Sequence, residues 1–204
     1  MSRIKFNLSY FGRKVSQNNT KTCWILKCDV RKFFASIDQK ILVDILKFHN
    51  LDNDTIWLLE KVISSFHSTE IGKGLPLGNL TSQLLVNIYM NEFDQFVKHR
   101  LKAKYYIRYA DDFVLMSQNR SELENTLTQI RFFLKDNLKL TLHPNKVSIT
   151  TLSSGVDFLG WVHFPHHRVL RTVTKSRMLK NLRDNPKLEI IQSYLGMLKW
   201  GMWL

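Results

Sequence analysis

Apolar and other side chains alternate along Tyr105–Ser117, on both sides of the adjacent acids Asp111 and Asp112. The alternation includes Ile107 before the acids and resumes at Phe113 after them. Because a period of two is typical of strands, the pattern predicts a strand, a tight turn and a second strand, with both acids at the tip. Aspartate is also a common turn former, so a solvated turn is the alternative interpretation.

A second strand-forming segment, Cys23–Val30, carries the acid Asp29 near its far end. Its β-branched and aromatic residues favour a strand. An aspartate that ends a strand is most often a turn residue or a helix cap. The next residues, Arg31–Phe34, add two cations and two aromatic rings, a mixture suited to a triphosphate and a sugar. Solvated cations and core phenylalanines are the alternative interpretation.

Several segments have the three-to-four-residue apolar spacing of amphipathic helices. The predicted helices run from Ser36 or Asp38 to about His49, over about Asp54–Phe66, over Leu80–Asp94 with Asn79 or Thr81 as its cap, and onward from a capping box at Ser121–Glu124. The predicted buried stripe of the third helix is Leu84, Leu85, Ile88, Tyr89 and Phe93.

The remaining segments complete the predicted fold. Residues 2–21 are polar and basic and resemble the last helix of something longer, whereas the tail from Lys187 to Leu204 restarts a helical pattern that ends in the bulky residues Trp200, Met202 and Trp203. Leu138–Thr151 and Val156–Phe164 are predicted strands. Strands and helices in this order predict an α+β fold, an antiparallel sheet with helices on one face.

Composition favours a globular protein with a polyanionic partner. The 204 residues contain 30 Lys and Arg against 17 Asp and Glu, a formal charge of +13 spread along the chain. Such a balance suits a phosphate backbone, although it also serves solubility or anionic membrane surfaces. No run of 18 apolar residues and no signal-like start occurs, so a cytoplasmic protein without membrane contact is expected.

The cysteines and histidines do not suggest a metal site. Cys23 and Cys28 lack metal-ligand spacing and are expected to be reduced core thiols. The histidines around Pro165 have no cysteine or acid at ligand spacing, so a turn is the better interpretation.

The three acids together suggest nucleotidyl transfer. If Asp29 lies beside the hairpin tip, its carboxylate joins those of Asp111 and Asp112 in a set that can hold two divalent ions about 4 Å apart. Magnesium prefers such oxygen ligands, with Mn²⁺ as an alternative ion. The loop Gly72–Asn79 leads into a predicted helix and could approach a phosphate, but it is not a Walker loop, so it is a weak signal alone.

These segments resemble the palm domain of reverse transcriptases. Tyr109–Asp112 looks like the catalytic box of that family, and Asp29–Phe34 like its first metal-binding box. Gly74–Gln83 is similar to the template and nucleotide loop, and Lys146 stands where the family has a lysine that protonates pyrophosphate. By this likeness Phe34 excludes a ribose 2′ hydroxyl.

The resemblance implies a role for each matching residue. The catalytic residues would be Asp29, Asp111, Asp112 and Lys146, the nucleotide-binding residues Val30, Arg31, Lys32, Phe33, Phe34, Gly78 and Gln83, and the primer grip Phe158, Leu159, Gly160 and Trp161. The first three would also hold two Mg²⁺ ions. At Thr81–Gln83 the sequence resembles the diversity-generating retroelement branch of bacterial enzymes, which work with an accessory protein. Group II intron enzymes are related but usually have Ser-Pro at this point.

The chain departs from the family at its ends. Only about twenty residues precede Cys23, where the family has fingers, and Ser193–Trp200 resembles only the opening helix of the thumb. The predicted domains are therefore a fingers remnant at 1–22, a palm at 23–164, and a palm-to-thumb connection with the start of the thumb at 165–204.

The expected function is an RNA-directed DNA polymerase that uses an RNA template, a DNA or RNA primer and deoxynucleoside triphosphates. A catalytically inactive, maturase-like RNA-binding fragment is the alternative from another class. A DNA-templated or untemplated nucleotidyltransferase would share the same chemistry.

Overall fold

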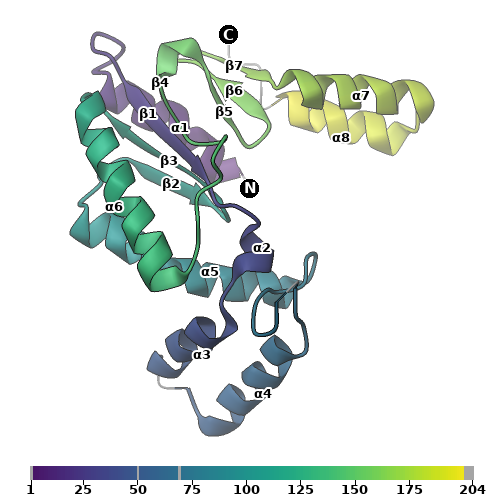
Figure 1. Cartoon of the computed structure of the whole chain (residues 1–204). Coiled ribbons are helices and arrows are strands. Elements are labelled where there is room, and N and C mark those ends of the chain that lie inside the picture. Colours follow the sequence, from purple (N-terminus) through teal and green to yellow (C-terminus); the bar gives the residue numbers. More distant parts are fainter. Residues whose placement is uncertain (1, 50, 69, 200–204) are drawn as a thin grey trace. The chain divides into compact units, whose positions relative to one another are not determined.

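The computed structural model describes residues 2–49, 51–68 and 70–199, which form helices and two small sheets (Figure 1). In chain order the elements are α1 (Ser2–Val15), β1 (Trp24–Asp29), α2 (Phe33–Ser36), α3 (Gln39–Phe48), α4 (Asn53–Ser64), α5 (Leu80–Gln95), a π-helical turn η1 (Phe96–Arg100), β2 (Tyr106–Tyr109), β3 (Asp112–Ser117), α6 (Arg120–Leu138), β4 (Ser148–Thr151), a 3₁₀ turn η2 (Leu152–Ser154), β5 (Val156–Phe158), β6 (Trp161–His163), β7 (Arg168–Leu170), α7 (Thr172–Asp184) and α8 (Leu188–Lys199).

The chain divides into two compact units. Unit 1 comprises Met1–Ile25, Met116–Arg120 and Ile149–Leu204, and unit 2 comprises Leu26–Leu115 and Ser121–Ser148. One sheet has the strand order β2-β3-β1-β4 and the other the order β5-β6-β7. The mixture of helices and antiparallel strands confirms the predicted α+β class, whereas the predicted domain boundaries stay predictions.

The hairpin predicted around the two acids is confirmed. Strands β2 and β3 are antiparallel, with Tyr109 opposite Asp112. Only Ala110 and Asp111 separate the strands, and Ala110 adopts a left-handed φ of 52°. A two-residue hairpin turn needs positive φ at its first position. The tight turn presents Asp111 at its tip, and β3 begins with Asp112.

The predicted helices are confirmed with small shifts at their ends. Asp38 caps α3, because its side chain accepts a hydrogen bond from Ile41 N at 3.1 Å. Asn79 is the N-cap residue of α5, without a hydrogen bond from its side chain. Helix α6 begins at Arg120, one residue before the predicted cap Ser121.

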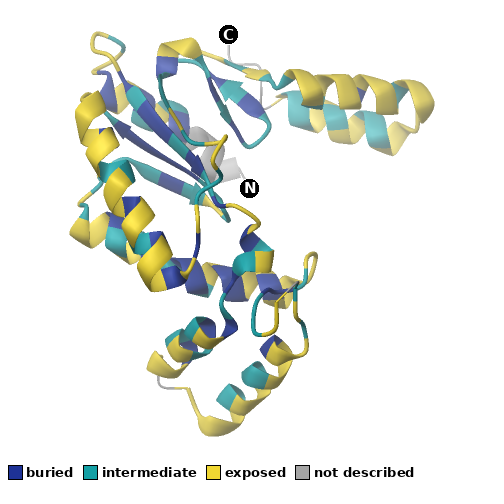
Figure 2. Cartoon of the chain, viewed as in Figure 1, coloured by how far each residue is buried: buried dark blue, intermediate teal, exposed yellow. Residues whose placement is uncertain are grey.

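The core of unit 2 lies between α5, α6 and the hairpin, where Figure 2 shows the inward faces as buried. The Phe93 ring lies 4.9 Å from that of Phe113, and the Tyr89 hydroxyl donates to the Leu138 carbonyl at 2.6 Å. The predicted stripe was wrong at Leu84, which is 62% exposed. Buried residues follow the i, i+4 row that contains Tyr89 and Phe93, and Leu84 is turned away from that row.

The C-terminal strands differ from the prediction. Val156–Phe164 is not one strand but the hairpin β5–β6, because Leu159 and Gly160 turn the chain with φ values of 52° and 81°. Of the predicted strand Leu138–Thr151, only Ser148–Thr151 forms β4. Leu138 ends α6, and Pro144 removes a backbone donor from the segment between.

Two helical predictions near the ends are also confirmed. Helix α1 occupies the basic start, and α8 the tail up to Lys199. Trp200, Met202 and Trp203 lie outside the described residues. Helix α7 and strand β7 were not predicted, since their apolar spacing is weak. None of the helices in the described ranges combines the length and apolar content that a bilayer crossing requires.

Candidate active site

The three predicted acids lie on adjacent segments of unit 2. Asp29 is the last residue of β1, Asp111 is in the β2–β3 turn, and Asp112 is the first residue of β3. The backbone amide of Val30, the residue after Asp29, donates to the Asp111 carbonyl at 3.2 Å. Asp29 is about eighty residues from Asp111 and Asp112 in the sequence, and the fold brings the three acids together.

Two lysines face these acids. Lys146 Nζ lies 3.0 Å from Asp29 Oδ2, and Lys27 Nζ lies 3.8 Å from Asp112 Oδ1. With the side chains in these positions, the described part of the chain contains no group of three His, Cys, Asp or Glu side chains gathered as metal ligands. The acids are neighbours through their backbone, while two of the carboxylates are directed at ammonium groups.

Burial makes both hairpin acids reluctant to ionise. The pKa of Asp111 is raised by desolvation and by the negative charge of Asp29. Desolvation also raises the pKa of Asp112, with further increases from Asp29 and Asp111, although the charge of Lys27 opposes them. Asp112 Oδ1 is buried and accepts no hydrogen bond from the described residues. Additional positive charge at this position would therefore stabilise the ionised form.

The loop before β4 is fixed beside the end of β1. His143 N donates to the Asp29 carbonyl, and Arg31 N donates to the Thr141 carbonyl, both at 2.8 Å. These bonds position Lys146, whose side chain is 54% exposed, at the carboxylate of Asp29. The structure thus brings this predicted residue to the acids.

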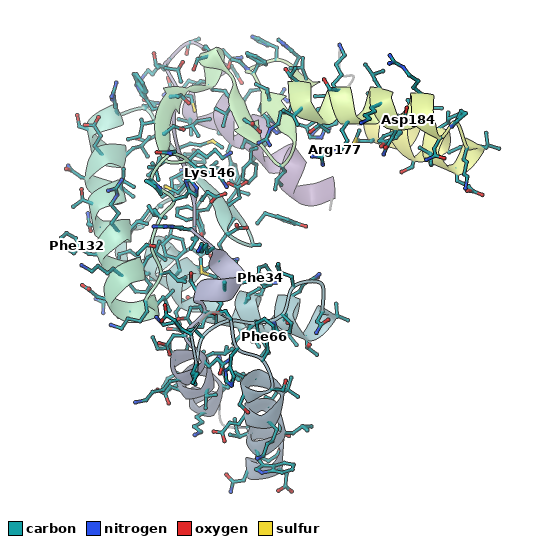
Figure 3. All side chains as sticks on the ribbon, turned by 45° about the vertical axis from the view of Figure 1, so that its right-hand side comes forward. Phe34, Phe66, Phe132, Lys146, Arg177 and Asp184 are labelled. Atoms are coloured by element: carbon teal, nitrogen blue, oxygen red, sulfur yellow. The ribbon has the colours of Figure 1, made fainter. Side chains whose placement is uncertain are left out.

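The predicted nucleotide-binding segment combines buried and accessible side chains. Val30 and Phe33 are 1% and 3% exposed, so only their backbone is available to a ligand. Arg31 and Lys32 are exposed, and Phe34 is half-buried on α2. Figure 3 labels Phe34 on this helix and Lys146 on the loop before β4.

The glycine loop is hydrogen-bonded to the same segment. Leu75 N donates to the Phe34 carbonyl at 2.9 Å, and Gly74 N donates to the Ile37 carbonyl at 2.8 Å. Gly78, with φ of 89°, and Gln83, in the first turns of α5, are both exposed. The loop and the residues after Asp29 therefore form one connected surface of unit 2.

The four predicted primer-grip residues lie in unit 1. Phe158 and Trp161 are 0% and 3% exposed and belong to the core of the second sheet, while Leu159 and Gly160 form its first turn. The acids belong to unit 2, and the role of these four residues stays a prediction.

Three charged residues near the acids were not predicted from the sequence: Lys27, Asp94 and Arg108. Lys27 and Arg108 are cations inside strands with apolar neighbours, and Asp94 lies at the end of the apolar stripe of α5. A charge at such a position needs a partner, which is a signal that the sequence offered.

Comparisons with known proteins place the chain in one family. Residues 2–163 match the family model "Reverse transcriptase (RNA-dependent DNA polymerase)". Protein YkfC of Escherichia coli (strain K12) is 27% identical over 190 residues, which cover 74% of this chain and 48% of that protein. The group II intron-encoded protein LtrA of Lactococcus lactis subsp. cremoris is 24% identical over 239 residues, covering 82% of this chain and 39% of that protein.

Solved structures share the fold. A structure of telomerase from Candida albicans with a fragment of telomeric RNA superposes with a TM-score of 0.63 at 13% identity, covering 84% of this chain and 34% of that one. The chain thus spans less than half of the length of each of these relatives. Since the family model covers most of the chain, the protein belongs to the reverse transcriptase (RNA-dependent DNA polymerase) family.

Proposed function

We propose that this chain carries the catalytic palm of an RNA-directed DNA polymerase. It would extend a DNA or RNA primer with deoxynucleoside triphosphates on an RNA template. The observation that carries the proposal is the meeting of Asp29 with the Asp111–Asp112 turn, joined by the 3.2 Å bond from Val30 N to the Asp111 carbonyl. Carboxylates gathered from two neighbouring segments are the ligands that a two-metal site for nucleotidyl transfer needs.

The acids fit divalent cations by their chemistry. All three offer oxygen donors, which Mg²⁺ and Mn²⁺ prefer, and Asp112 Oδ1 is a buried acceptor to which none of the described residues donates a hydrogen bond. Asp29, Asp111 and Asp112 would hold the ions, and the Asp29 carboxylate would then give up its contact with the Lys146 ammonium. When bound, two such ions would activate the primer hydroxyl and neutralise the leaving pyrophosphate.

Other residues would position the nucleotide and move a proton. Arg31 and Lys32 are exposed and follow Asp29 by two and three residues, where their charges would attract the triphosphate. The half-buried ring of Phe34 would contact the sugar, and the exposed Gly78 and Gln83 would contact the nucleotide or the template. Lys146, already within 3.0 Å of Asp29, would donate a proton to the departing pyrophosphate.

Primer extension on an RNA template tests the proposal. Wild-type protein should incorporate deoxynucleotides only with added Mg²⁺ or Mn²⁺, and Asp111→Asn should abolish incorporation. Asp136→Asn, which removes an exposed acid from α6, should extend normally. Incorporation without a divalent ion, or equal rates for both variants, would overturn the proposal.

The same experiment separates the competing functions. A wild-type chain that binds RNA but incorporates nothing under any condition would be the inactive RNA-binding protein. Faster extension on DNA than on RNA templates would indicate the DNA-templated enzyme. We assign no closer relation within the family, so the diversity-generating retroelement branch and its accessory protein stay predictions from Gln83.

A further inference from the structure

A charged network lies behind the acidic turn, on the side of α5. Arg108 of β2 binds Asp94 of α5 through two hydrogen bonds, Nε to Oδ1 at 2.9 Å and Nη2 to Oδ2 at 2.7 Å. Tyr106 donates its hydroxyl proton to the same Oδ1 at 2.6 Å. Only 9% of the Arg108 side chain is exposed. Such a buried pair costs desolvation, so it needs excellent geometry, which the two parallel bonds supply.

The same guanidinium also holds the backbone of the turn. Arg108 Nη1 donates to the Ala110 carbonyl at 3.0 Å. Ala110 has the left-handed φ of 52°, which is unfavourable for a residue with a Cβ. Strained backbone persists where surrounding contacts determine it. The peptide group before Asp111 is thus fixed by Arg108, and the carbonyl after it by the 3.2 Å bond from Val30 N.

The network continues toward the glycine loop. Arg108 Nη1 also lies 3.5 Å from Asn87 Oδ1, and the Asn87 amide donates to the Gln83 carbonyl at 2.8 Å. Gln83 lies in the first turns of α5, the helix that follows the glycine loop. One arginine therefore connects the turn that carries Asp111 to the helix that carries Asp94, Asn87 and Gln83.

We propose that Arg108, held by Asp94, is a positioning residue that sets the Asp111–Asp112 turn for cation binding and aligns it with the start of α5. The proposal rests on the proposed function, because positioning matters only if the two acids hold cations. Arg108 makes none of its described contacts with the carboxylates of Asp111 or Asp112, so it acts through the backbone. Residues that orient metal ligands without binding the metal typically lower metal affinity or activity by about 10–100-fold when they are substituted.

The planar fork of the side chain is essential to this role. Arg108 uses Nε and both Nη atoms on Asp94 and Ala110. A lysine has one nitrogen and cannot make both the paired carboxylate bonds and the carbonyl bond. Arg108→Lys should therefore keep the charge and lose the positioning, whereas a purely electrostatic role would survive it.

The test uses the full chain and three readouts: hydrogen exchange of residues 109–113, Mn²⁺ affinity measured by electron paramagnetic resonance, and primer extension separated into kcat and KM. The variants are Arg108→Lys, Arg108→Gln and Asp94→Asn, with Arg13→Gln as the control at an exposed arginine. If Arg108→Gln does not fold, Arg108→Lys and Asp94→Asn carry the test.

We expect exchange at the turn to rise by roughly tenfold in the folded variants, because a hydrogen bond that restrains it is lost. Mn²⁺ affinity and kcat should fall by about 10–100-fold, with the nucleotide KM changed less. The control should match wild type in all three. Folded variants with wild-type exchange and wild-type Mn²⁺ affinity would overturn the positioning role. Wild-type protein that binds Mn²⁺ no more tightly than Asp111→Asn would instead overturn the proposed function, while the exchange data still decide whether Arg108 fixes the turn.

Discussion

The helix-capping acid Asp52 and the two hairpin acids have opposite pKa shifts, and the partners of their carboxylates explain the difference. Asp52 accepts hydrogen bonds from the backbone amide and the hydroxyl of Thr55, which lower its pKa. It is therefore an ionised, solvent-exposed helix cap. Asp111 and Asp112 have raised pKa values, chiefly from desolvation. Carboxylates whose ionisation is opposed by burial and by each other are candidates for function, whereas capping acids are not.

Lys146 should affect catalysis without affecting stability. Its side chain is 54% exposed, so water screens its ion pair with the 13% exposed Asp29, and the pair should contribute at most about 1 kcal/mol to folding. Lys146→Gln should therefore leave the melting temperature within about 4 °C of wild type but slow single-turnover nucleotide addition by about 100-fold, the contribution typical of a general acid. Lys135→Gln is the control, since that lysine is exposed on α6. Equal slowing in both variants would contradict a specific role in proton transfer.

Phe34 should control sugar selection. Its ring is half-buried and packs edge-to-face against Phe33, with centroids 5.5 Å apart, so its position is restrained. Phe34→Val should raise incorporation of ribonucleotides relative to deoxynucleotides by at least about tenfold, because a smaller side chain leaves room for the 2′ hydroxyl. The ratio of kcat/KM values for the two triphosphates measures this change. Phe132→Val, at a ring that is 63% exposed on α6, should leave the ratio unaltered (Figure 3).

The two thiols should be unreactive in the folded chain. Burial raises the pKa of Cys23 to about 11 and that of Cys28 to about 12. At pH 8, at most about one thiol in a thousand is therefore ionised. Because the thiolate is the reactive form, the rate of thiol labelling should increase with pH up to these pKa values. A disulfide exchange reagent should therefore label neither cysteine at pH 8 and both after denaturation. Rapid labelling of the folded protein would contradict the burial.

At the scale of elements, the glycine loop provides a stability test with an internal control. A Cβ on Gly74 would lie 2.7 Å from Ser68 Cβ, and Gly74 has φ of 94°. Gly74→Ala should cost about 3 kcal/mol of unfolding free energy, from left-handed strain plus overpacking. Gly78 has a similar φ of 89° but open space around it, so Gly78→Ala should cost only about 1 kcal/mol.

Urea unfolding of both variants measures the difference. Equal losses of free energy would mean that the loop moves away from Ser68 without cost. Gly74 N donates to the Ile37 carbonyl, and the Gly74 carbonyl accepts from the side-chain amide of Gln39 at 3.0 Å. A larger loss for Gly74→Ala should be accompanied by weaker nucleotide binding, because these bonds fix the glycine loop beside the predicted nucleotide-binding segment.

Elements whose signal is local were predicted well from the sequence. The β2–β3 hairpin follows from alternation around a two-residue turn, and α3 from its spacing and the Asp38 cap. The hairpin β5–β6 was not predicted, because its turn needs a left-handed φ at Leu159 and leucine rarely adopts that conformation. The Arg108–Asp94 pair was missed for a different reason: its members are fourteen residues apart on different elements, so the need for a partner is visible in the sequence but the partner is not.

At the scale of the whole chain, the excess of cations should govern RNA affinity. The formal charge of +13 is distributed along the sequence, and RNA binding should release counterions from the phosphates that these cations neutralise. The logarithm of the binding constant should therefore fall linearly with the logarithm of salt concentration. If six or more phosphates are contacted, affinity should drop by about 10³-fold or more between about 50 and 200 mM salt.

Asp111→Asn separates binding from chemistry in this measurement. The substitution removes a carboxylate and leaves every Lys and Arg in place, so the salt dependence measured by fluorescence anisotropy should keep its slope, while primer extension is lost. An affinity that does not change with salt would contradict electrostatic recognition by the chain. A variant that loses RNA affinity and extension together would mean that the acidic turn supports the RNA-binding surface as a whole, because the loss of chemistry alone leaves the counterion term intact.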